Sequence, residues 1–100
     1  MKIEILDEAE LDLVDGFHFY EGQEVGLGWY FLDSLFSDVD SLLLHAGIHE
    51  RIYGYYRCLA KRFPFAVYYS VEEGIIRVYA VLDCRRNPSW IRENLTKHGQ

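Results

Sequence analysis

The sequence has 100 residues, half of them apolar, and a net charge of −6. This length and apolar content predict one domain over residues 1–100 with an adequate core, and no run approaches the roughly 20 apolar residues needed to span a bilayer. The N-terminal residues alternate charged and apolar side chains and lack the apolar centre of a secretory signal, so we expect a soluble cytoplasmic protein without a membrane partner.

Charge is divided unevenly along the chain. Residues 1–50 hold twelve acids and one base, whereas residues 51–100 hold four acids and nine bases, giving net charges of −11 and +5. An anionic partner is therefore expected at the second half, and the acidic first half argues against a protein that coats nucleic acid. Cys58 and Cys84 lie in strand-like runs, which predicts small buried thiols and no disulfide.

The first half predicts a strand followed by a helical hairpin. Ile3 and Ile5 alternate with charged residues as in a short strand. Asp7 and Glu10 have the spacing of a capping box, which predicts a helix over about 8–22 that Gly22 ends. A second helix is expected over about 25–43, and the short turn between the two makes them antiparallel. Apolar residues recur every three or four positions in both helices: Ala9, Leu13, Phe17 and Tyr20, then Leu27, Phe31, Leu35, Val39 and Leu42.

The second half predicts strands and a closing helix. Runs rich in aromatic and β-branched residues predict strands over 51–60, 65–71 and 75–84, with a hairpin turn at 72–74. In the last strand, Ile76, Val78, Ala80 and Leu82 should face the helices. Pro88 predicts the start of a short C-terminal helix. The fold class is α+β, with a helical hairpin on an antiparallel sheet and Leu13, Phe17, Leu35, Val78 and Leu82 in the core.

Several possible sites are disfavoured by their spacing. The glycines of residues 22–28 follow no strand and precede no Gly-Lys-Ser/Thr, so they are interpreted as turn and close-packing glycines. His45 and His49 are four residues apart, but Gly47 lies between them and no further ligand is near, so no metal is expected. Glu8 and Asp12 are interpreted as surface charges on a helix. No cofactor is predicted.

Arginines and tyrosines form the candidate binding surface. Arg57 and Arg77 lie within predicted strands, and Arg85 and Arg86 end the last one, so their guanidinium groups could converge on the sheet or its rim and hold phosphates or carboxylates. The alternative is that the arginines at the rim pair with the acidic helices.

The sequence resembles the toxins of the RelE/ParE superfamily of type II toxin–antitoxin systems, often called plasmid stabilisation proteins. The resemblance lies in A-E-L-D-L at 9–13, F-Y-E at 19–21, F-P-F-A-V-Y-Y at 63–69 and V-L-D-C-R-R-N-P-S-W at 81–90. It implies a β-α-α-β-β-β fold and an antitoxin whose tail wraps the toxin. The partner surface implied comprises Tyr55, Arg57, Arg77, Tyr79, Arg85, Arg86 and Trp90.

The family has two branches of action. Its ribosome-dependent messenger RNA cleavers use several lysines and arginines and a terminal Tyr or His, whereas the ParE branch poisons DNA gyrase without catalysis of its own. This sequence places Tyr56, Cys58, Phe65 and Trp90 at the matching positions, which leaves Arg57, Arg85 and Arg86 as a depleted nuclease set and favours the ParE branch. The alternatives are a ribonuclease and a non-toxic relative that acts as an antitoxin-bound repressor component. Asp83, where many relatives carry His, puts a negative charge beside Arg85.

Overall fold

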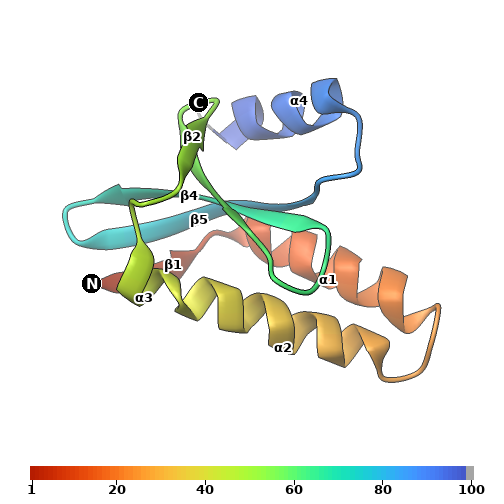
Figure 1. Cartoon of the computed structure of the whole chain (residues 1–100). Helices are drawn as coiled ribbons and strands as arrows, with labels where there is room; N and C mark the ends of the chain where they lie inside the picture. The colour runs from red at the N-terminus through yellow and green to blue at the C-terminus, as the bar shows by residue number, and fades with distance from the viewer. Residues whose placement is uncertain (99–100) are drawn as a thin grey trace.

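The elements follow one another in the predicted order, but the predicted strand over 51–60 is divided in two, and the predicted helix over about 25–43 ends at Asp40 and is followed by a separate short helix. A computed structural model describes residues 1–98, and Figure 1 shows their course. The elements are β1 (Lys2–Ile5), α1 (Asp7–Glu21), α2 (Leu27–Asp40), α3 (Leu42–His45), β2 (Glu50–Ile52), β3 (Tyr55–Leu59), β4 (Phe65–Glu72), β5 (Ile75–Asp83) and α4 (Pro88–His98).

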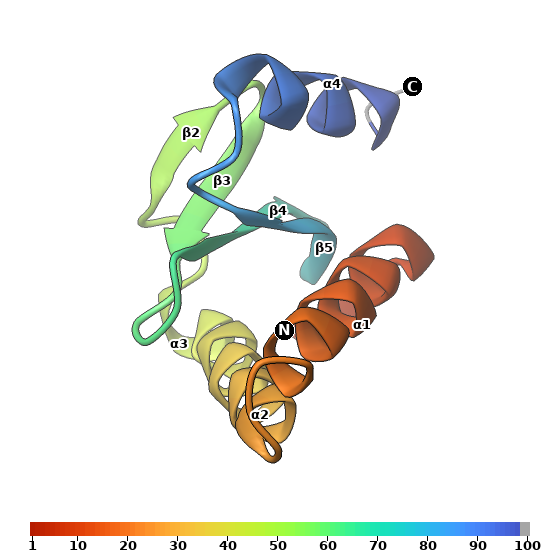
Figure 2. The ribbon, with the colours of Figure 1, turned by 90° about the vertical axis from the view of Figure 1, so that its right-hand side faces the viewer.

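The strands form one five-stranded sheet in the order β1-β5-β4-β3-β2. Neighbouring strands are antiparallel except β1, which runs parallel to β5, so the sheet is mixed where the sequence predicts a wholly antiparallel one. The α1–α2 hairpin covers one face, and α4 lies on the opposite face (Figures 1 and 2). The fold class, α+β with a helical hairpin on a sheet, is confirmed.

The predicted strand over 51–60 is wrong as a single strand. Tyr53 and Gly54 both have positive φ, 52° and 86°, and form a two-residue turn between β2 and β3. Such a turn matches the twist of an antiparallel hairpin, and glycine at its second position adopts this φ without strain. The predicted turn at 72–74 has the same geometry, with Glu73 and Gly74 at 51° and 76°.

A β-bulge divides β5 between the two faces of the sheet. Tyr68 of β4 pairs with Ala80 and Tyr69 pairs with Val78, so Tyr79 is an extra residue. Ile76 and Val78 face the α1–α2 hairpin as predicted, but Ala80 and Leu82 face α4. Their predicted placement is wrong because a bulge reverses the side-chain alternation beyond it.

Two apolar cores result, one on each face. The larger core, between the sheet and the hairpin, includes Leu13, Leu35 and Val78, as predicted. Leu82 is buried instead in the smaller core, which α4 closes. Phe17 is only half-buried, at the hairpin turn, where its ring meets Trp29 edge to face at 4.9 Å. The smaller core comprises Tyr55, Ala66, Tyr68, Ala80, Leu82 and Leu95.

The helix ends differ in detail from the prediction. Leu6, not Asp7, is the N-cap of α1, and no side chain caps it, so the predicted capping box is absent. At the start of α2, the Glu21 carboxylate accepts hydrogen bonds from the N–H groups of Gly26 and Gly28 at 2.9–3.1 Å. Gly28 is a close-packing glycine, since a Cβ there would lie 2.6 Å from the carbonyl oxygen of Phe17. This confirms the interpretation of residues 22–28.

The two cysteines are free. Cys58 is buried as predicted, whereas Cys84 is exposed because it lies just beyond the end of β5. Among residues 1–98, no helix is long and apolar enough to cross a membrane.

Candidate functional site

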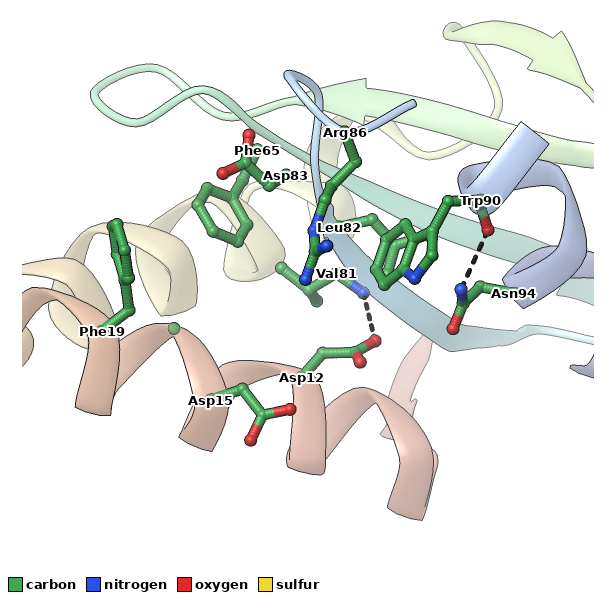
Figure 3. A pocket seen from close by; sticks show the side chains of 11 residues that line it. Asp12, Asp15, Phe19, Phe65, Val81, Leu82, Asp83, Arg86, Trp90 and Asn94 are labelled. Atoms are coloured by element: carbon green, nitrogen blue, oxygen red, sulfur yellow. Dashed lines mark hydrogen bonds between the residues drawn. The ribbon is translucent and has the colours of Figure 1, made fainter. Parts of the chain in front are cut away.

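A groove of about 360 Å³ lies between α1, the end of β5 and the start of α4 (Figure 3). Its lining combines aromatic and aliphatic side chains with four charged ones. The residues are Asp12, Asp15, Gly16, Phe19, Phe65, Val81, Leu82, Asp83, Arg86, Trp90 and Asn94. Concave surfaces with an apolar floor and a few placed polar groups are the usual form of a binding site.

Asp12 sits where β5 loses its outer neighbour. β1 pairs with β5 only as far as Val78, so the N–H of Val81 has no strand partner on that side. The Asp12 carboxylate accepts a hydrogen bond from this N–H at 3.0 Å (Figure 3). Burial raises the pKa of Asp12 to about 6, and the nearby carboxylates of Asp15 and Glu8 add to the effect. The interpretation of Asp12 as a surface charge is therefore wrong.

The raised pKa of Asp12 predicts a pH-dependent stability. The folded chain binds the proton more tightly than the unfolded chain, so the free energy of unfolding should fall as pH rises from about 3.8 to about 6. Asp12→Asn keeps an oxygen that can accept from Val81 and removes the charge. We expect it to raise the free energy of unfolding at pH 8 by roughly 1 kcal/mol, after allowance for solvent screening, and to leave stability at pH 3 nearly unchanged.

Urea unfolding at both pH values measures this effect. Asp33→Asn, which neutralises an exposed carboxylate on α2, is the matched control. A stability loss at pH 8 in Asp12→Asn would contradict the assignment, because it would mean that the ionised carboxylate stabilises the fold.

Arg86 and Trp90 meet at the α4 side of the groove. The Arg86 guanidinium lies over the Trp90 ring, with 4.3 Å between Cζ and the ring centroid. Asn94 donates a hydrogen bond to the Trp90 carbonyl at 2.9 Å, one turn along α4 (Figure 3). Trp90 is half-buried and Arg86 exposed, so the pair presents an aromatic ring with a cation stacked on one of its faces.

Arg85 is held by Asp83 rather than free to bind an anion. Its Nη2 and Nε donate to the two oxygens of Asp83 at 2.7 and 3.0 Å, and Nη2 also approaches the Tyr20 hydroxyl at 3.5 Å. The hydrogen bonds from Arg85 hold the pKa of Asp83 below its ordinary value. The negative charge expected beside Arg85 therefore neutralises that guanidinium.

Arg57 and Arg77 are also paired, and they lie on different parts of the sheet. Arg57 on β3 donates to Glu50 on β2 at 2.9 Å, and Arg77 on β5 donates to Glu4 on β1 at 3.1 Å. Arg57 and Arg77 therefore bind separate carboxylates, while Arg57 also lies within electrostatic range of Cys84 at the end of β5. Each guanidinium has its own local partner.

Tyr55 and Tyr79 are brought together, but under α4. Their ring centroids are 4.9 Å apart, and the Tyr55 hydroxyl donates to the carbonyl of Leu95 at 3.2 Å. Tyr55 is 8% exposed, and burial raises its pKa. Tyr55 is therefore covered by α4, and the half-buried Tyr79 is the one of the two rings that is partly open to a partner.

Sequence reasoning missed the α1 side of the groove. Asp12, Gly16 and Phe19 stand at i, i+4 and i+7 on one side of α1, a spacing that could have been recognised as a second helix face. His49 hydrogen bonds through Nδ1 to the Tyr69 hydroxyl, and no group of three metal-ligating side chains occurs in the described part of the chain.

Comparison with known proteins identifies the fold. No protein-family model and no curated protein matches the sequence. Among solved structures, the chain is similar to one from the chromosomal ParDE TA system of P. aeruginosa, with a TM-score of 0.70 and 17% identity, covering 81% of this chain and 92% of that one. This similarity confirms the fold that the resemblance implied.

Proposed function

We propose that this protein is the toxin component of a type II toxin–antitoxin pair. In this proposal it acts in the cytoplasm, arrests growth by binding a protein target such as DNA gyrase, and is neutralised by a cognate antitoxin. The ParE/RelE-like fold supports the general assignment. The choice of a protein target over RNA rests on the charge of the groove.

The groove is unfavourable for a nucleic-acid backbone. Asp83 is paired with Arg85, which leaves Asp12 and Asp15 with Arg86 as the one cation among the lining residues, although Lys97 of α4 also lies within electrostatic range of Asp12. A phosphate in this space would face two carboxylates, and phosphate binding depends on an excess of positive charge. A peptide with an apolar anchor and a basic side chain suits the groove better, since Phe19 and Trp90 supply apolar contact area.

The arginines that a ribonuclease would need are also engaged. Arg57 and Arg85 are each bound to a carboxylate, and an RNA phosphate would have to displace it. A guanidinium stays protonated at neutral pH and cannot act as a general base. The ribonuclease and the non-toxic repressor component therefore become outcomes that the experiment must distinguish.

The proposal is tested by expressing the chain from a tightly regulated promoter in a bacterial host. We expect growth arrest and an accumulation of cleaved DNA–gyrase complexes, with messenger RNA left intact. The double variant Arg86→Ala/Trp90→Ala removes the cation and the ring from the groove and should reduce the loss of viable cells at least roughly tenfold, the effect of losing about 1.4 kcal/mol of binding.

The control Leu59→Ala/Arg62→Ala removes one exposed leucine and one exposed arginine away from the groove and should remain toxic. Codon-phased cleavage of ribosome-bound messenger RNA that is lost in Arg85→Ala would replace the proposal with the ribonuclease. Normal growth with abundant folded protein would replace it with the non-toxic relative.

A further inference from the structure

The outer face of the α1–α2 hairpin, turned away from the sheet, exposes large apolar side chains. Leu11 and Val14 of α1 are 62% and 47% exposed, and Trp29 and Phe36 of α2 are 62% and 42% exposed. Figures 1 and 2 show no other element on this side of the hairpin. Apolar side chains gathered on one face mark an interaction surface more often than those scattered singly.

The register of the two helices places these side chains along one stripe. Phe17 contacts Trp29, and Gly16 lies against the Phe31 ring, which sets the antiparallel register of the two helices. In that register, the helical turn of α1 that contains Val14 lies beside the part of α2 that contains half-buried Leu32. The helical turn that contains Leu11 lies beside Phe36. The stripe therefore runs along the seam between α1 and α2, the shape into which a third helix packs. We call it the outer stripe: Leu11, Val14, Phe17, Trp29, Leu32 and Phe36.

The charge beside the outer stripe is of one sign. From residue 7 to residue 40 the sequence contains ten acidic residues and no lysine or arginine. Glu10 on α1 and Asp33 and Asp40 on α2 are exposed along the stripe. Because no cation is available within the hairpin, a partner that supplied lysines or arginines would relieve repulsion among these carboxylates as well as form new ion pairs.

We infer that the outer stripe is a docking surface for a basic amphipathic helix of another protein. Such a helix would place apolar side chains at i, i+3 or i+4, and i+7 over Val14 and Phe36, with flanking lysines or arginines against Glu10 and Asp33. This inference does not depend on the proposed function, because the surface lies on the opposite side of α1 and α2 from the sheet and away from the groove.

Other occupants conflict with the charge. A second copy of the chain that packed through the same face would bring another ten acidic residues against it. Nucleic acid and anionic lipid surfaces are negative too, so the same repulsion opposes them. A basic protein segment satisfies both the apolar and the acidic features.

The test uses two synthetic helical peptides of about 18 residues with the same leucine face, one with lysine and one with glutamate at every polar position. Titration calorimetry with the full chain should detect binding of the lysine peptide, weakened at high salt, and none of the glutamate peptide. Val14→Ser/Phe36→Ser should weaken the lysine peptide at least roughly tenfold. Ile48→Ser/Leu59→Ser, which removes exposed apolar side chains elsewhere, should bind like the parent chain.

A second variant keeps the test decisive if the serine variant melts early. Glu10→Gln/Asp33→Asn leaves the apolar side chains in place, and should weaken the lysine peptide and reduce the salt dependence of its affinity. The inference is overturned if the lysine peptide does not bind, if both peptides bind equally, or if the two variants bind it like the parent chain. Concentration-dependent dimers of the parent chain that Val14→Ser/Phe36→Ser abolishes would overturn it in favour of self-association.

Discussion

Replacing Leu35 by alanine is expected to lower the free energy of unfolding by about 3 kcal/mol. Leu35 of α2 is fully buried in the core between the hairpin and the sheet, so its truncation removes buried apolar contacts and leaves a cavity. For a chain of this size, the melting temperature should fall by roughly 10–20 °C. Differential scanning calorimetry measures both quantities.

Leu11→Ala is the matched control, since Leu11 lies in the other helix of the hairpin with most of its side chain in solvent. Its effect should stay within about 0.5 kcal/mol. Equal losses in the two variants would contradict the burial of Leu35 and the direction in which the hairpin presents its apolar face.

Replacing Leu95 by alanine should release α4 from the sheet before the rest of the fold opens. Leu95 of α4 is fully buried in the smaller core, and its carbonyl accepts a hydrogen bond from the Tyr55 hydroxyl. Its truncation should cost about 2 kcal/mol. We expect amide hydrogen exchange in α4 to accelerate roughly thirtyfold, with little change in α1 and α2, because Leu95 packs in the smaller core while both hairpin helices pack in the larger one.

Arg92→Ala, at an exposed position of α4, is the control and should leave exchange in the helix nearly unchanged. If Leu95→Ala accelerated exchange equally in α1, α2 and α4, the two cores would form one cooperative unit. The separate opening of α4 would then be excluded.

Helices and hairpin turns could be predicted because their signals are local. The apolar spacing from Phe31 to Leu42 follows the helical period, and all four of its members are buried. Glu73 and Gly74 form the predicted turn because glycine adopts positive φ without strain. The turn at Tyr53 and Gly54 carries the same glycine signal, but the aromatic residues around it resemble one continuous strand.

Strand pairing could not be predicted at this level. The bulge at Tyr79 arises where β5 pairs with β4, and it moves Ala80 and Leu82 to the opposite face. Nothing in the alternation of β5 itself marks this position, since an aliphatic residue fits either face of a sheet covered on both sides.

The candidate site, too, could be predicted only in part from the sequence. The sequence predicted Arg86 and Trp90 as binding residues, and these two side chains do lie against each other in the groove. It also placed Asp83 beside Arg85, since these residues are neighbours in the chain. It did not identify Asp12 as a groove residue, because the contact between Asp12 and Val81 joins positions far apart in the chain.

By itself, the sequence determined the fold class, the order of the elements, the helical hairpin and the contrast between an acidic first half and a basic second half. These features follow from local periodicity, turn residues and composition. Only the tertiary structure decided that Arg57 and Arg77 are each paired with a carboxylate on a neighbouring strand, that α4 covers Tyr55, and that Asp12 is desolvated beside β5. The physical reason is that charge pairing and burial depend on which distant segments meet in space.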